Sequence, residues 1–312
     1  MSEENGANGA RGPLADLLAL LDLERVEQDI FRGVSRSALV PRVFGGQVAA
    51  QALVAAGRTV PDDSSPSSRL RSSRGGPTAH SLHAYFLRPG DPGAPIVYTV
   101  DRIRDGRSFT TRRVVAVQHG QPIFHLSASF QAYEEGLEHQ VGMPAAPDPE
   151  TLPTAADALP LHLPPDVARR LVEARAAVDL RYADLPPWGT VGRPREPRSQ
   201  VWFRTNGKLE GEHAGSLLHL CLATYVSDMT LLDSVLLAHG RGGWAVGDVV
   251  GASLDHAMWF HRPFRADEWL LYDQESPSAG GGRGLGQGRI WTRDGRLAVT
   301  VIQEGVVRVP RP

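Results

Sequence analysis

The chain has 312 residues, 41% of them hydrophobic, which is enough to bury the core of one large domain or two modest ones. Its formal net charge of −2 at pH 7 argues against a nucleic-acid-binding protein, because such proteins carry a basic excess. A single cysteine, Cys221, excludes a disulfide framework and a metal site built from several thiolates.

The first part of the chain predicts two helices followed by strands. Residues 14–24 carry leucines at helical spacing, and residues 47–58 form an alanine-rich helix that a sheet could wrap closely. A His-Gly pair at Gly120 is typical of a hairpin turn. The strands are predicted at residues 81–87, 96–104, 110–119 and 122–133.

The middle of the chain predicts little regular structure. Residues 134–197 are rich in proline, and their pattern predicts a surface connector with one helix at 165–178. An earlier Ser- and Arg-rich stretch, residues 62–77, is expected to be a loop.

The last part repeats the plan of the first. A strand and turn at residues 199–207 precede a helix at 217–238, which is apolar nearly all round and is therefore expected to be buried. The remaining strands are predicted at residues 252–260, 268–276, 286–293 and 297–308.

Two segments of the chain resemble each other. Phe86 and Arg88 of the first recur in the same order and spacing as Phe260 and Arg262 of the second. We therefore expect an α+β protein with two copies of one unit. The boundaries are predicted at 14–133 for the N-terminal unit, 134–197 for the connector and 198–308 for the C-terminal unit.

Several well-known signatures are absent from the sequence. It contains no Gly-x-Ser-x-Gly elbow, and its glycine-rich stretch at 279–288 does not fit the dinucleotide-binding motif, so a flexible strand connection is expected there. His256 and His261 are five residues apart on a predicted strand, so their side chains point to opposite faces and are poorly placed to bind one metal ion. Asp255 and His256 are interpreted as a structural pair.

Asp228 is the unusual residue of the apolar run from Cys221 to Leu237. A buried carboxylate without partners costs several kcal/mol or shifts its pKa, so its presence needs a reason. From the residues alone, a structural hydrogen bond and a catalytic role both remain open.

Eight short motifs, in this order, resemble the acyl-CoA thioesterase II family over residues 14–308. They are RVFGGQVAAQAL, YFLRPGD, RDGRSFTTRRV, ASFQ, YVSD, SLDHAMWFHRPF, EWLLY and QEGVVR. The resemblance implies a double hotdog fold, in which two tandem units each wrap an antiparallel sheet around a long helix. It also implies hydrolysis of medium- or long-chain fatty acyl-CoA to the free acid and coenzyme A by an activated water, with no metal or redox cofactor.

The resemblance carries three catalytic positions onto this chain. Asp228 matches the family's catalytic Asp, Gln303 matches its catalytic Gln, and Ser253 stands where the family usually has Thr. Asp228 would activate or orient the water, and the other two would hold the geometry. The FGGQ stretch at residues 44–47 opens a helix and is a candidate source of oxyanion donors, although the sequence does not locate it beside Asp228.

Partners and rival functions complete the expectations. We expect acyl-CoA as substrate, a cytoplasmic location, a homo-oligomer, no nucleic acid and no membrane insertion, since no apolar run of 18 residues occurs. Two alternatives remain. A non-catalytic acyl-CoA-binding or sensor protein would lack the three polar groups. An enoyl-CoA hydratase would need a His near Asp228, and none precedes His239.

Overall fold

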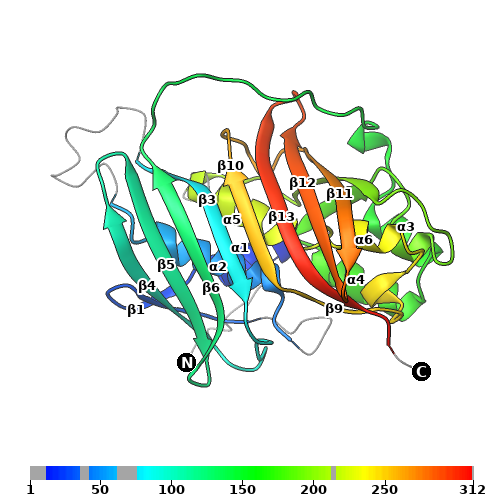
Figure 1. Cartoon of the computed structure of the whole chain (residues 1–312), viewed down its shortest axis with the longest axis horizontal. Coiled ribbons are helices and arrows are strands. Elements are labelled where there is room, and N and C mark those ends of the chain that lie inside the picture. The colour runs from blue at the N-terminus through cyan, green and yellow to red at the C-terminus, as the bar shows by residue number, and fades with distance from the viewer. Residues whose placement is uncertain (1–11, 36–41, 62–75, 212–215, 311–312) are drawn as a thin grey trace, which may run out of the picture.

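The computed structural model describes residues 12–35, 42–61, 76–211 and 216–310. The loop predicted at residues 62–77 lies almost entirely outside them. In the described part of the chain, thirteen strands form one continuous antiparallel sheet (Figure 1). No helix among these residues is both long and apolar enough to cross a bilayer.

The N-terminal half of the sheet has the order β1-β2-β4-β5-β6-β3. The four strands predicted here are present, and two short strands that the sequence pattern did not indicate, β1 and β2, extend the edge. The bounds are β1 Glu24–Glu27, β2 Ile30–Gly33, β3 Thr78–Phe86, β4 Ile96–Asp105, β5 Phe109–Gln118 and β6 Gln121–Gln131.

The C-terminal half repeats this order outward from the centre, as β10-β13-β12-β11-β8-β7, with β9 added to β13. The halves join where β3 pairs with β10, so that Leu82 lies opposite Met258 and Ala84 opposite His256. The bounds are β7 Val178–Tyr182, β8 Arg198–Thr205, β9 Val250–Ser253, β10 Asp255–Phe260, β11 Leu270–Gly280, β12 Arg283–Thr292 and β13 Leu297–Arg308.

Two central helices cover one face of the sheet and lie behind it in Figure 1. Helix α2 (Gly45–Gly57) belongs to the first half and α5 (Ser216–Ser227) to the second, and they pack against each other. Almost every residue of α2 is buried, because its alanines let α5 and the sheet approach from several sides. Helix α1 (Pro13–Leu21) packs beside α2.

The long helix predicted at residues 217–238 is wrong in one respect, because the structure breaks it. Helix α5 ends at Ser227, and a separate short helix, α6 (Asp233–Leu237), follows after a turn. Strand β11 holds the break open: the Tyr272 hydroxyl donates to the Ser227 carbonyl at 3.2 Å, and Gln274 donates to Thr230 at 2.6 Å. These contacts satisfy groups at the end of α5 that would otherwise continue the helix.

Glycines in the sheet make room for this broken segment. On β12, a Cβ added at Gly284 would lie 2.4 Å from Val235, and one at Gly286 would lie 3.0 Å from the Leu231 carbonyl. The glycine-rich stretch is therefore a close-packed strand as well as a hairpin, whose turn residues Gly281 and Gly282 have φ of 58° and 75°.

The connector is more ordered than the sequence pattern predicted. It contains α3 (Ala155–Ala158) as well as α4 (Pro165–Arg175), and its last strand, β7, pairs with β8 at the edge of the sheet. Apolar and charged residues alternate in β7 over only five positions, which is too short for the pattern to indicate a strand beside the prolines.

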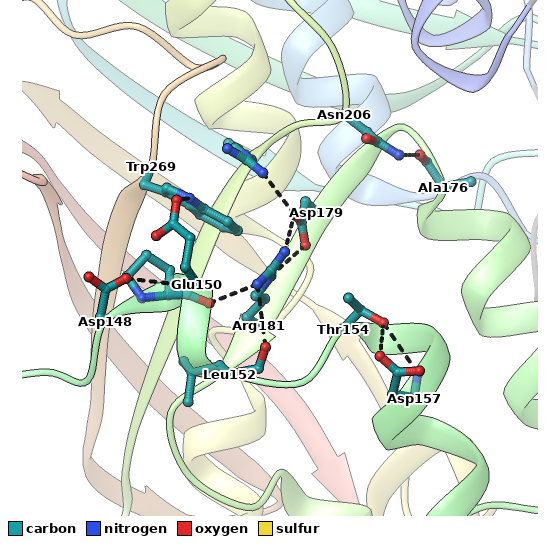
Figure 2. Close-up of polar contacts among 12 residues, drawn as sticks. Asp148, Glu150, Leu152, Thr154, Asp157, Ala176, Asp179, Arg181, Asn206 and Trp269 are labelled. Atoms are coloured by element: carbon teal, nitrogen blue, oxygen red, sulfur yellow. Dashed lines mark hydrogen bonds and ion pairs between the residues drawn. The ribbon is translucent and has the colours of Figure 1, made fainter.

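Polar contacts tie the connector to the outer face of the sheet (Figure 2). Arg181 on β7 pairs with Asp179 and donates to the carbonyls of Pro149 and Leu152, while the Trp269 indole donates to Glu150 at 3.0 Å. The connector thus acts as a strap across the second half, on the face away from α5.

Candidate active site

Asp228 lies in the turn immediately after α5, where the broken helix leaves its side chain half-buried. The apolar pattern predicted that Asp228 lies inside a continuous helix, but it lies in a turn instead. The carboxylate lies close to β9, to β13 and to the first residues of α2, three elements that are far apart in the sequence.

The structure brings the three sequence-predicted residues together. The Ser253 hydroxyl, at the end of β9, donates to Asp228 Oδ1 at 2.9 Å. The Gln303 amide, from the middle of β13, donates through Nε2 to the same oxygen. Gln303 is fully buried, so its amide is fixed in place, whereas Ser253 keeps partial exposure.

An interruption of one strand accompanies this convergence. The strand predicted at residues 252–260 is split at Leu254 into β9 and β10. Ser253 pairs with Gly305 and Ala257 pairs with Ile302, both on β13. The split lets Ser253 turn toward the helices beside Gln303.

The N-terminus of α2 supplies the other wall of the site. A Cβ added at Gly45 would lie 2.7 Å from Asp228 Oδ2, and one at Gly46 would lie 2.4 Å from the Tyr225 carbonyl of α5. The Gly46 amide also hydrogen-bonds to the Asp228 carboxylate. Because the start of a helix carries partial positive charge, this arrangement favours a carboxylate and any other oxyanion nearby.

The electrostatic balance keeps Asp228 more basic than an ordinary aspartate. Burial raises its pKa above the usual 3.8. Hydrogen bonds from Gln303, Ser253 and the Gly46 amide limit the rise, as does the positive charge of Arg42. The result is a carboxylate with fixed orientation and an increased affinity for a proton, which is what a general base requires.

Aromatic rings surround the polar cluster. Phe44, which precedes α2, contacts Tyr225 of α5 edge to face at 5.2 Å between ring centroids. Phe86, at the end of β3, lies against Gly45 and contacts Phe124 at 5.0 Å. The surroundings of the carboxylate are thus apolar on the side of the first half.

Among the residues that the structure describes, the first half has no second copy of this site. Strand β6 occupies the place that β13 has in the second half, and Ala128 stands eight residues after the hairpin glycine Gly120, as Gln303 does after Gly295. The first half therefore lacks the amide and instead contributes the start of α2 to the one site described here.

Sequence reasoning missed the role of particular backbone groups. The Gly-Gly pair at the start of α2 was a candidate for oxyanion donors, but only the fold reveals that it adjoins Asp228. His256 and Asp255 face opposite sides of the strand, as expected of neighbours, but they are not a pair, because each bonds to a different partner. Asp255 accepts from the Glu304 amide at 2.7 Å, and His256 bonds to the Ser227 hydroxyl at 2.8 Å.

Comparison with known proteins agrees with the fold. Residues 35–131 match the family model described as the acyl-CoA thioesterase N-terminal domain, and residues 144–307 match the acyl-CoA thioesterase C-terminal domain. Human acyl-coenzyme A thioesterase 8 is 41% identical, with 98% of this chain and 95% of the relative covered. Acyl-CoA thioesterase 2 of Haemophilus influenzae is 41% identical, with 95% and 98% covered.

Solved structures give the same result. The crystal structure of the acyl-CoA thioesterase II TesB2 from Mycobacterium marinum superimposes with a TM-score of 0.73 at 43% identity, covering 94% of this chain and 98% of that one. A hot dog fold protein from Alicyclobacillus acidocaldarius, 18% identical, superimposes with a TM-score of 0.71 over 95% of this chain and 99% of its own, which supports the fold. With two family models spanning both halves and relatives aligned along nearly its whole length, the chain belongs to the acyl-CoA thioesterase family, and its fold is the double hotdog.

Proposed function

We propose that this protein hydrolyses acyl-CoA thioesters to the free carboxylic acid and coenzyme A. The observation that carries the proposal is the Asp228 carboxylate, held by Ser253 and Gln303 beside the N-terminus of α2. Relatives over 40% identical along nearly the full chain bear the name acyl-CoA thioesterase, which supports the same substrate class.

The proposed reaction needs only a water molecule and the residues of the site. Asp228 takes a proton from the water, and the oxygen of that water attacks the thioester carbonyl carbon. The negative charge that develops on the carbonyl oxygen is stabilised at the N-terminus of α2, near Gly45. The carbon–sulfur bond then breaks, the thiolate leaves as coenzyme A, and the proton held by Asp228 returns to the products.

Ser253 and Gln303 act on the base rather than on the thioester in this proposal. Both donate to Asp228 Oδ1, so the carboxylate cannot rotate freely and its other oxygen is directed toward α2. Ser253 provides the hydroxyl that threonine would provide, and it makes the hydrogen bond to Asp228 without the methyl.

Two rival functions fit the geometry less well. A hydratase would need an imidazole beside the carboxylate, but His256 Nε2 bonds to the Ser227 hydroxyl. A non-catalytic acyl-CoA sensor would not need the carboxylate fixed by two side-chain donors, and both donors are present.

The finer parts of the proposal concern chain length, location and assembly. Aromatic walls formed by Phe44, Tyr225 and Phe86 suit a medium or long acyl chain. Cys221 is buried and forms no disulfide, which suits a location in the reducing cytoplasm. A homo-oligomer suits the outer face of the sheet, where Tyr85 is 54% exposed.

The test is a series of acyl-CoA substrates of increasing chain length, with released thiol trapped by a dye. Wild-type protein should release thiol and prefer medium or long chains. Asp228→Asn should lower kcat by about 10²- to 10⁴-fold, because the water loses its base while the side-chain volume is kept.

A matched control separates loss of the base from loss of the fold. Asp101→Asn removes a carboxylate that is exposed on β4 and paired with Arg113, and it should leave turnover unchanged. Circular dichroism should be the same for both variants. Binding of acyl-CoA without thiol release by the wild type would favour the sensor, and turnover by Asp228→Asn at the wild-type rate would refute the assignment of the base.

A further inference from the structure

His256 is a buried polar residue that the proposed reaction does not use. It lies on the inner face of β10 and is 1% exposed. Continuing the register in which Ala257 pairs with Ile302 places His256 opposite Gln303 on β13, with both side chains on the same face. Side chains of directly opposed residues lie about 4.5–5.5 Å apart at Cβ, so the imidazole and the amide are immediate neighbours.

The polar atoms of these two residues complement each other. Gln303 uses Nε2 to donate to Asp228, which leaves Oε1 as an acceptor. Gln303 Oε1 and His256 Nδ1 are both buried, and neither has a partner of good hydrogen-bond geometry among the described residues. When Nδ1 carries the proton, His256 supplies a donor and Gln303 Oε1 supplies the matching acceptor.

The far side of the imidazole is compatible with that tautomer. The Ser227 hydroxyl has one proton, and both His256 Nε2 at 2.8 Å and the Thr224 carbonyl at 2.9 Å are within reach as acceptors. Asp255 does not compete, because it accepts from the Glu304 amide on the opposite face. When Ser227 donates to Nε2, a continuous chain runs from the Ser227 hydroxyl through His256 and Gln303 to the Asp228 carboxylate.

The orientation of the Gln303 amide decides whether the site works. The amide can occupy its buried position in two orientations related by a flip. In one, Nε2 donates to Asp228; in the other, Oε1 faces the carboxylate and repels it. Repulsion from Asp228 disfavours the second orientation, and a donor facing Oε1 from the other side would strengthen the preference for the first.

We propose that His256 is a positioning residue, whose Nδ1–H faces Gln303 Oε1 and thereby directs the Gln303 amide nitrogen toward Asp228. The inference rests on the proposed function, since it assigns a role within the same site. His256 touches neither the water nor the thioester in this arrangement, and it acts only through Gln303.

The charge state of His256 suits this role. Burial lowers its pKa to about 4, and the interaction with Gln303 offsets only part of the fall. The imidazole is therefore neutral around pH 7, with one donor and one acceptor, and the donor can be assigned to a single side.

Three substitutions at His256 test the position of the donor. His256→Asn places an amide nitrogen near the position of Nδ1, His256→Gln places one near Nε2, and His256→Phe keeps the ring without a donor. We expect His256→Phe and His256→Gln to lower kcat about tenfold, because each loses one hydrogen bond to Gln303, and to leave KM within about twofold of the wild type. His256→Asn keeps the donor and should retain most of the wild-type kcat.

A control and a double-mutant cycle separate this role from simple packing. His261→Phe removes an imidazole that bonds to Thr300 from the residue just after β10, and it should leave kcat unchanged. In a Gln303→Met background, His256→Phe should cause no further loss, because its effect passes through the amide. Additive losses, or equal losses in the Asn and Phe variants, would overturn the proposal.

A readout without turnover completes the experiment. Nitrogen-15 NMR of the wild-type protein labelled at histidine should show His256 as the Nδ1–H tautomer, and Gln303→Met should perturb that signal. Observation of the Nε2–H tautomer would refute the inference whatever the kinetics. A wild type with the expected tautomer but no thiol release would instead refute the proposed function.

Discussion

Asp228 shows how a single side chain can be costly to the fold and useful for chemistry. Burial opposes its ionised form, while Ser253, Gln303 and the Gly46 amide favour that form through hydrogen bonds. The balance leaves the pKa above 3.8, so the carboxylate accepts a proton more readily than an exposed aspartate does.

The balance predicts the pH dependence of turnover. The base works only when ionised, so kcat/KM should fall as the pH drops through a pKa that lies above 3.8. The Ser253 hydrogen bond lowers this pKa, so Ser253→Ala should move the acidic limb to higher pH and lower kcat at pH 7 about tenfold. Profiles of kcat/KM measured upward from about pH 4, close to the pKa of an unperturbed aspartate, would test this.

Ser253→Thr provides the comparison for that measurement. It keeps the hydroxyl that donates to Asp228, so the acidic limb should stay at its wild-type position. An unchanged limb in Ser253→Ala would show that the hydroxyl does not set the basicity of the carboxylate.

The family motifs pointed to three side chains that the structure brings together, but not to their surroundings. Asp228, Ser253 and Gln303 were recognisable because each lies in a motif of the family. The Gly46 amide and His256 were not, because an amide has no signature in the sequence and a histidine on a strand can serve many purposes. Only the register of β10 against β13 places His256 opposite Gln303.

Among the elements, α2 and the end of α5 determine the shape of the site. The predicted helix continued through residues 228–232 because Leu231, Leu232, Val235 and Leu236 maintain an apolar pattern. The break depends instead on the Tyr272 and Gln274 side chains of β11, which are distant in sequence. Hairpins were easier to predict, since His119 and Gly120 have the positive φ values, 49° and 71°, that such turns require.

The close approach of α2 to α5 gives a prediction for Gly46. An added Cβ would lie 2.4 Å from the Tyr225 carbonyl, a backbone atom that cannot move without shifting α5. Gly46→Ala should therefore destabilise the protein by about 1–3 kcal/mol and reduce kcat, since Asp228 follows directly after α5. Urea unfolding and thiol release measure the two effects.

Gly136→Ala is the matched control, because nothing lies within 4 Å of the position where its Cβ would be. It should match the wild type in both measurements. Gly46→Ala with wild-type stability and turnover would mean that the two helices are not tightly coupled at this point.

The whole molecule presents a sheet with one covered face and one that is largely bare (Figure 1). Exposed or half-exposed rings gather near the junction of the halves, where His83 contacts Trp259 and Tyr85 contacts His125. Such a surface on a continuous sheet suits a second copy of the chain. Light scattering coupled to gel filtration should give a mass of more than one chain.

Two substitutions test whether this face forms the contact. Tyr85→Glu on the bare face should shift the protein toward the monomer, because it places a charge in the interface. Glu173→Gln, on the exposed side of α4, should not change the mass. A monomeric wild type would refute the assembly without affecting the proposed chemistry of the site.

The repeated architecture was predictable from the matching motifs, whereas the single site was not. The motifs indicate two similar units, but they do not reveal that Ala128 replaces Gln303 in the first half or that β3 and β10 join the halves into one sheet. Those features arise from packing between segments that are far apart in the chain.

The seam between β3 and β10 also determines what a protease can achieve. The stretch that leads from β6 into the connector has no regular secondary structure, and Leu137 within it is fully exposed, so it is the natural point of attack. A cut there severs the covalent link but leaves the seam ladder and the α2–α5 contact intact. The two fragments should therefore copurify and retain thiol release, and separate only when the protein is denatured.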